Sequence, residues 1–141
     1  MRHQKARHLL SKPADQRNAL LRSLATELLR HDEIITTLSK AKALRPHVER
    51  LITKGKNAHI ADYANLAEKA KKGDAAAAKE VARSVHLRRQ LRARLYDRDV
   101  VKRVVDEVAP RYMDRQGGYC RIIKYRNQTG DNTPLAIIQL V

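Results

Sequence analysis

The sequence predicts an α+β fold in two layers, with a small three-stranded sheet packed against several helices. Most of the chain has apolar residues at helical spacing, but the short run from Glu33 to Thr37 is β-branched and strand-like. Two further strand-like runs, Tyr119 to Arg126 and Leu135 to Val141, flank a segment with strong turn chemistry and read as a hairpin. Because a lone hairpin is marginally stable, we expect Glu33 to Thr37 to supply the third strand.

The first helix should run from Pro13 to Arg30. Its apolar side chains recur at i, i+3, i+4 and i+7, which places them on one face, more typical of a core than of a partner groove. The residues of this face are Leu21, Leu24, Ala25 and Leu28.

The second helix should begin at Leu38, directly after the first strand. The hydroxyl of Thr36 or Thr37 can cap it by accepting from a first-turn N–H group. Pro46 should kink or break this helix, or stand in the first turn of a new one, because proline removes a donor and crowds the preceding turn. Gly55 lies between two lysines and should end the helix in a left-handed cap.

Further helices are expected in the middle of the chain. Residues 58–72 are polar and alanine-rich, and Asp74 is a good N-cap for the alanine run that follows it. Between Asp97 and Ala109 the valines recur in pairs at i+4, so their period favours a helix although valine prefers strands. Pro110 should end that helix.

The composition favours a polyanionic partner. The 141 residues include 30 Lys and Arg against 15 Asp and Glu, a formal charge of +15, and the sequence pI is near 10.4. Neutralising phosphates releases condensed counterions, which would stabilise a complex of so basic a chain. The charge could instead serve only solubility. A membrane surface is a weaker alternative, since the cations are spread over every segment rather than over one amphipathic helix.

No signal-peptide h-region is visible, and no apolar run approaches the ~20 residues of a membrane span.

Two segments concentrate the positive charge. Residues 1–12 carry four cations, two histidines and no acid, and should form either a basic arm that orders on nucleic acid or a solvated terminus. The run from Val81 to Tyr96 has five arginines and no acid. Arg88 and Arg92 share one helical face there, which favours phosphate contact over a solvated face, because solvated faces usually mix signs.

Residue patterns for catalysis or metal binding are missing from the sequence. No histidine stands at metal spacing from a second ligand, and the one cysteine, Cys120, should be a small buried thiol. Gly117 and Gly118 are not followed by the Lys-Ser or Lys-Thr of a phosphate-binding loop. Asp97 and Asp99 could be imagined as a nuclease pair but are more typical of helix caps. We therefore expect no enzyme activity, no cofactor, no metal and no small-molecule substrate, and binding to structured RNA through charge and shape.

Four stretches of the chain resemble one known family, the bacterial-type large-subunit ribosomal proteins of family seventeen. The first stretch is Met1-Arg2-His3, and the second is Arg17 with Ala19 to Arg22. The third runs from Leu29-Arg30-His31 through Ile35-Thr36-Thr37 to Arg45. The fourth runs from Ala109-Pro110-Arg111-Tyr112 through Gly117-Gly118-Tyr119 to the closing residues Ala136 to Val141. Their combination in this order is specific, whereas Gly117-Gly118 alone would mean nothing.

The resemblance implies a structural ribosomal protein with a two-layer α/β fold, bound to large-subunit ribosomal RNA near the peptide exit tunnel. Its partners would be that RNA and neighbouring ribosomal proteins, in a cytoplasmic or an organellar ribosome. Combining the family pattern with the charge pattern, we expect RNA contacts from Arg2, His3, Lys5, Arg7, Arg17, Arg22, Arg30, Thr36, Thr37, Lys40, Lys42, Arg45, Arg88, Arg92, Gly118, Tyr119 and Arg121. Gly117 and Gly118 could instead shape a turn, since glycine adopts left-handed backbone at low cost.

Two features depart from the family pattern. Residues 56–95 form a longer segment than the family usually has, so within a single domain of residues 1–141 we expect an inserted helical segment there. Gln128-Thr129 precede Gly130-Asp131 where the family usually has two basic residues, which argues against an RNA contact at that turn. Two alternatives stay open: a DNA-packaging protein, and an RNA-processing enzyme that uses Asp97 or Asp99.

Overall fold

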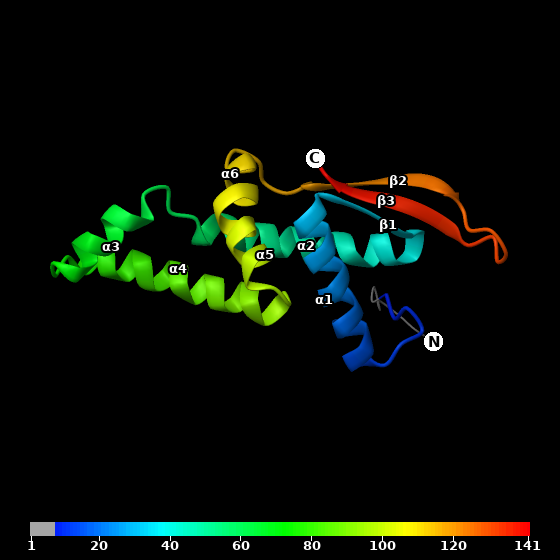
Figure 1. Ribbon diagram of the computed structural model, residues 1–141, viewed down its shortest axis with the longest axis horizontal. Helices are drawn as coiled ribbons and strands as arrows, with labels where there is room; N and C mark the ends of the chain where they lie inside the picture. The colour runs from blue at the N-terminus through cyan, green and yellow to red at the C-terminus, as the bar shows by residue number, and fades with distance from the viewer. Residues whose placement is uncertain (1–7) are drawn as a thin grey trace. The chain divides into compact units, whose positions relative to one another are not determined.

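The computed structural model describes residues 8–141 and confirms the α+β class (Figure 1). Of the predicted basic arm, residues 1–7 lie outside the described part. The elements in chain order are α1 (Ala14–His31), β1 (Glu33–Thr37), α2 (Leu38–Ala58), α3 (Tyr63–Lys71), α4 (Ala75–Arg94), α5 (Arg98–Arg103), the π-helix η1 (Val104–Val108), α6 (Ala109–Arg111), β2 (Cys120–Asn127) and β3 (Pro134–Leu140).

The chain divides into two compact units. The first, here called the sheet unit, contains residues 8–48 together with Cys120–Val141, and the second, here called the helical unit, contains Glu49–Tyr119. Helix α2 begins in the sheet unit and ends in the helical unit.

The sheet has the strand order β1-β3-β2, and both pairings are antiparallel. Strand β1 is the predicted Glu33–Thr37 and pairs with β3, the last strand of the chain. Because side chains alternate along a strand, each cross-strand row faces one side. On one side of β3, Ala136 and Ile138 are fully buried. On the other side, Ile35, Ile137 and Ile123 pair in one row, here called the isoleucine row, and Ile35 and Ile123 are 59% and 41% exposed.

Aliphatic side chains of α1 and α2 form the core of the sheet unit. On the predicted face of α1, Ala25 and Leu28 are fully buried, and Leu21 and Leu24 are half-buried. Asp32 ends α1 in the left-handed region (φ 65°) with its N–H donating to the Leu28 carbonyl. Helix α1 contacts β1 and β3. The buried residues that α2 contributes are Ala41, Ala43, Leu44 and Val48.

Helix α2 begins at Leu38, as predicted, but its N-terminal cap and its C-terminal end differ from the prediction. Neither Thr36 nor Thr37 makes a side-chain hydrogen bond with residues 8–141, so the expected threonine cap is absent there. The strand leads into the helix without an intervening residue, which leaves both threonines in the sheet ladder. Pro46 does not end the helix, because it lies on the exposed side, where water can satisfy the carbonyl it leaves without a donor.

The prediction that Gly55 caps α2 is wrong, because the helix continues to Ala58 and Gly55 is buried inside it. A Cβ added at Gly55 would lie 2.8 Å from Val104 Cγ1 and 3.3 Å from the Val104 carbonyl oxygen. Real Cβ atoms essentially never approach another heavy atom as closely as 2.8 Å. Glycine therefore serves close packing between α2 and η1 rather than helix termination.

In the helical unit, α3 and α4 pack side by side as a hairpin (Figure 1). Asp74 caps α4 as predicted, since its carboxylate accepts from the N–H groups of Ala76 at 2.9 Å and Ala77 at 3.2 Å. Ser84 of α4 is buried and donates to the carbonyl of Ala58 at 2.6 Å. The hairpin thereby supplies a hydrogen-bond donor to a carbonyl at the C-terminal end of α2.

The valine-rich segment is helical, which confirms that its period outweighs the strand preference of valine. It comprises α5, η1 and α6, and the helix extends past Pro110 to Arg111. Pro110 thus stands in the last turn of this helical run, which ends one residue after it. The buried valines are Val100, Val101, Val104, Val105 and Val108.

Candidate nucleic-acid interface

Helix α2 carries three of the cations that were predicted to contact RNA in the sheet unit. Lys42 and Arg45 are exposed and lie one turn apart, whereas Lys40 is half-buried. The first turn of α2 contains no acid. None of these three side chains makes an ion pair or hydrogen bond with residues 8–141. Their donors are therefore available to phosphate oxygens.

The predicted arginines of α1 are partly engaged within the protein. Arg17 Nη1 donates to the Lys12 carbonyl at 3.3 Å. Arg22 is half-buried, and Arg30 is exposed but forms an ion pair with Glu27 at 2.8 Å. Such exposed pairs are worth about 0–1 kcal/mol, so a phosphate could replace Glu27 as the partner of Arg30 at little cost.

The remaining predicted residues of the sheet unit lie on the strands. Thr36 and Thr37 are half-buried at the end of β1, and Arg121 is exposed on β2. Arg121 occupies a cross-strand row with Gln139 and Glu33, on the same side of the sheet as the isoleucine row. Arg121 and the α2 cations thus belong to one unit.

The structure assigns different roles to the two arginines predicted on α4. Arg92 is exposed, one turn after Arg88. Arg88 is half-buried, and its Nη2 donates to Asp106 Oδ1 at 2.9 Å. Its guanidinium carbon also lies 5.8 Å from the centroid of the Tyr63 ring. Arg88 is therefore held by a carboxylate and a ring, two contacts within the protein that the sequence prediction of a phosphate contact did not include.

Tyr119 is buried, with only 2% of its surface exposed. Its hydroxyl donates to the Arg115 carbonyl at 3.2 Å and accepts from Lys56 Nζ at 3.3 Å. Burial raises the pKa of this phenol, but hydrogen bonds from the Gly117 backbone, Thr53 and Lys56 outweigh it and hold the pKa below the usual 10.0. The side chain thus fixes the fold, and an RNA contact at this place would fall to the neighbouring backbone.

That backbone is left-handed at both glycines, with φ of 90° at Gly117 and 64° at Gly118. Residues with a side chain rarely adopt these angles, so the glycines shape the turn that precedes β2. The RNA contact predicted for Gly118 remains a prediction. The predicted residues Arg2, His3, Lys5 and Arg7 lie outside the described part of the chain.

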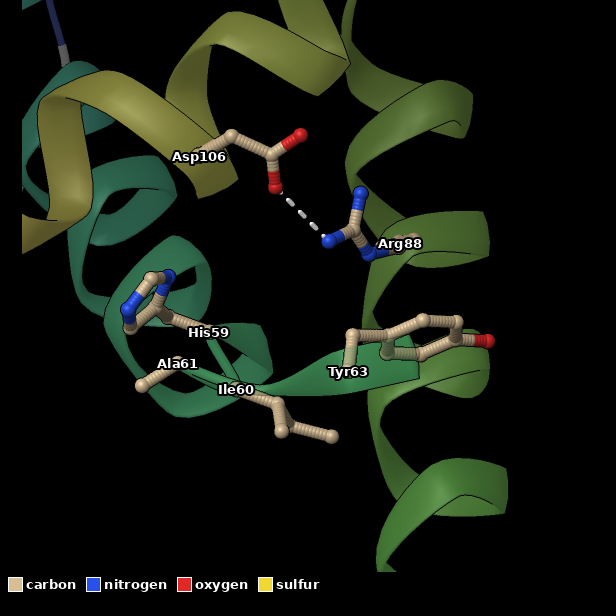
Figure 2. Close-up of a pocket in the computed structure, with 6 residues that line it drawn as sticks. All are labelled: His59, Ile60, Ala61, Tyr63, Arg88 and Asp106. Atoms are coloured by element: carbon tan, nitrogen blue, oxygen red, sulfur yellow. Dashed lines mark hydrogen bonds and ion pairs between the residues drawn. The ribbon is translucent and has the colours of Figure 1, made fainter. Parts of the chain in front are cut away.

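Sequence reasoning missed a cavity of about 480 Å³ in the helical unit. Figure 2 shows side chains from the loop between α2 and α3, from the start of α3, and from α4 and η1 around it. Its lining residues are His59, Ile60, Ala61, Tyr63, Arg88 and Asp106. These residues lie up to 47 positions apart in sequence. The one local signal of a binding site was the tyrosine in the polar, alanine-rich segment 58–72.

Within residues 8–141 no three His, Cys, Asp or Glu side chains come together as a metal site. Cys120 is a buried thiol outside any disulfide, as predicted. Asp97 occupies the N-cap position of α5 without a side-chain capping hydrogen bond. None of the helices in the described part is long and apolar enough to span a membrane.

Comparison with known proteins identifies the family. A model of the family described as Ribosomal protein L17 matches residues 20–141. The chain belongs to the ribosomal protein L17 family. A large ribosomal subunit protein bL17 of Kosmotoga olearia is 45% identical over the whole chain, which covers 93% of that protein. The bL17 proteins of Allorhizobium ampelinum and Thermotoga maritima are 40% and 38% identical over the whole chain, which covers 82% and 95% of them.

Family membership confirms the resemblance seen in the sequence. The match extends over the sheet unit from residue 20 onward and over the whole helical unit. The L17 family consists of structural proteins of the large ribosomal subunit, so this chain is a structural constituent of the ribosome and not an enzyme. The family therefore argues against a nuclease pair at Asp97 and Asp99.

Proposed function

We propose that this L17-family protein binds large-subunit ribosomal RNA by neutralising phosphates, at a position near the peptide exit tunnel. The observation that carries the proposal is the pair Lys42 and Arg45, exposed on α2 and without a partner among residues 8–141. A net charge of +15 on 141 residues supports it. The basic arm and the cations of α1 would extend the same contact.

The mechanism is release of counterions. Each phosphate neutralised by a lysine or arginine releases condensed cations, so the logarithm of the binding constant falls linearly with the logarithm of the salt concentration. Lys42 and Arg45 need little reorganisation to reach phosphates, because they form no ion pair or hydrogen bond with residues 8–141 that must first be broken. Where cations of the protein neutralise the phosphates of two neighbouring RNA segments, the segments repel each other less and can pack closely.

The test measures binding to large-subunit ribosomal RNA over a salt series. We expect the double variant Lys42→Ala/Arg45→Ala to bind more weakly and to have a slope shallower by about 1 per lost phosphate contact. The matched control, Lys42→Arg/Arg45→Lys, keeps both charges and should keep the slope. An unchanged slope in the alanine variant would remove α2 from the interface.

Competition with duplex DNA separates this proposal from DNA packaging. Duplex DNA added at the same phosphate concentration should not displace the ribosomal RNA, because structured RNA offers 2′-hydroxyls and shape in addition to phosphate. Equal displacement would favour the DNA-packaging alternative. Position near the exit tunnel is tested by hydroxyl-radical cleavage of the RNA from a probe attached to the protein in reconstituted subunits.

The isoleucine row favours contact with a neighbouring ribosomal protein rather than with RNA. Ile35 and Ile123 are exposed and offer no donor to a phosphate. We expect Ile35→Asn to leave the salt dependence of RNA binding unchanged but to lower retention of the protein on salt-washed large subunits. Unchanged retention would show that the row stays open to solvent in the subunit.

A further inference from the structure

We infer that the cavity of the helical unit binds one unpaired guanine nucleotide of ribosomal RNA. This inference rests on the proposed RNA binding and goes beyond it, because it assigns a pocket for a base to residues outside the cationic interface of α2.

The walls of the cavity combine the surfaces that a nucleotide needs. Tyr63 is 37% exposed and offers part of its ring to a base, and Ile60 and Ala61 add apolar surface to the lining (Figure 2). Arg88 brings a positive charge against the same ring. Unpaired bases are commonly bound by stacking on tyrosine rings or arginine planes. The volume of about 480 Å³ lies within the range of small-molecule sites, about 300–1,000 Å³.

The polar groups of the cavity favour a base with hydrogen-bond donors. Asp106 uses Oδ1 to hold Arg88, and its side chain is 40% exposed, so the carboxylate can still accept from a ligand. His59 Nδ1 lies 2.9 Å from the Val105 carbonyl, and because a carbonyl only accepts, the imidazole donates from Nδ1. Guanine, with adjacent N–H and NH₂ donors, fits the Asp106 carboxylate better than uracil, which offers a single N–H.

The cavity is also held in shape before any ligand arrives. Arg88 is fixed by Asp106 on one side and by Tyr63 on the other. The bond to Val105 fixes the His59 ring. Asp106 stands on η1, and π-helical turns occur frequently at functional sites. Side chains fixed in this way lose little entropy on binding, which favours specific recognition.

The test uses the full chain and two readouts, affinity over a salt series and chemical probing of unpaired guanines in the bound ribosomal RNA. We expect wild-type protein to protect an unpaired guanine. Tyr63→Ala should abolish that protection and weaken binding roughly tenfold, as expected for loss of one stacked base. Because Tyr63 is uncharged, the salt slope should stay unchanged. Tyr63→Phe, which keeps the ring, should bind and protect like wild type.

Two controls make the result specific. Tyr125→Ala removes another exposed tyrosine that lies beside an arginine, but in the sheet unit, and should leave the guanine protected. Asp106→Asn places an amide donor in the cavity and should reduce protection of guanine. Far-UV circular dichroism confirms that each variant is folded.

Four outcomes overturn the inference. These are the absence of guanine protection by wild type, protection that survives Tyr63→Ala, a loss of protection in Tyr125→Ala equal to that in Tyr63→Ala, and protection unaffected by Asp106→Asn. Binding of free GMP to the purified protein tighter than about 1 μM would assign the cavity to a free nucleotide instead. If wild-type protein does not bind ribosomal RNA at any salt concentration, the proposed function fails, a result distinct from binding without protection.

Discussion

The contact between Gly55 and Val104 predicts a coupling that can be measured as a free energy. Gly55→Ala introduces a methyl group 2.8 Å from Val104 Cγ1, and the nearby Val104 carbonyl prevents a simple sideways shift. Overpacking a core in this way costs about 1–3 kcal/mol. Alanine regains about 0.5–1 kcal/mol as the better helix former. The single variant should therefore lose about 0–2 kcal/mol of unfolding free energy.

Val104→Ala removes the group that the new methyl meets. Alone, it loses two buried methyl groups at about 0.8 kcal/mol each and leaves a small cavity, a cost of roughly 2 kcal/mol. In the double variant, the methyl group introduced by Gly55→Ala occupies space that Val104 Cγ1 has vacated. The double variant should therefore lose less stability than the sum of the single variants, by about 1–2 kcal/mol.

The assay is equilibrium unfolding in urea, followed by far-UV circular dichroism, for wild type, both single variants and the double variant. As a control, Asn57→Ala changes an exposed residue of α2 two positions on, and it should add to Val104→Ala within about 0.5 kcal/mol. If the Gly55→Ala and Val104→Ala effects also add within that margin, the close approach does not explain why glycine stands at residue 55.

Three further predictions concern single hydrogen-bonded groups. Ser84→Ala should lower the free energy of unfolding by about 1–2 kcal/mol, because the buried Ala58 carbonyl at the end of α2 loses its donor; urea unfolding measures this. The depressed pKa of Tyr119 means that the folded protein loses this proton at a lower pH than the unfolded chain, whose value is 10.0. The wild-type free energy of unfolding should therefore rise, relative to Tyr119→Phe, as the pH rises through the depressed pKa toward 10. In the last loop, hydrogen bonds from the Thr133 hydroxyl and N–H hold the pKa of Asp131 below 3.8. An NMR pH titration should show this low midpoint, and Thr133→Ala should raise it.

Local periodicity predicted most of the elements. The strand Glu33–Thr37 has its predicted bounds, because a β-branched run between two helical patterns leaves little choice of boundary. The valines between residues 97 and 109 form helices because their spacing buries one face, and burial outweighs an intrinsic preference worth a fraction of a kcal/mol.

Long-range contacts explain the failures. The sequence Lys54-Gly55-Lys56 has the local signature of a helix end, yet the helix continues because Gly55 packs against Val104, 49 residues later. No local pattern carries that information. The same holds for Arg88, whose ion pair with Asp106 of η1, 18 residues later, has no signal in the local run of arginines that predicted a phosphate contact.

Arginine and lysine thus serve two kinds of recognition in this chain. Lys42 and Arg45 of α2 have no partner among residues 8–141, so their contribution to RNA binding should fall steeply with salt. Arg88 has a carboxylate partner and a ring beside it, so a base bound there is held by stacking and hydrogen bonds that salt screens weakly. Raising the salt concentration should therefore remove the first contribution before the second. The affinity that remains at high salt should depend on Tyr63 and Asp106 rather than on Lys42 and Arg45.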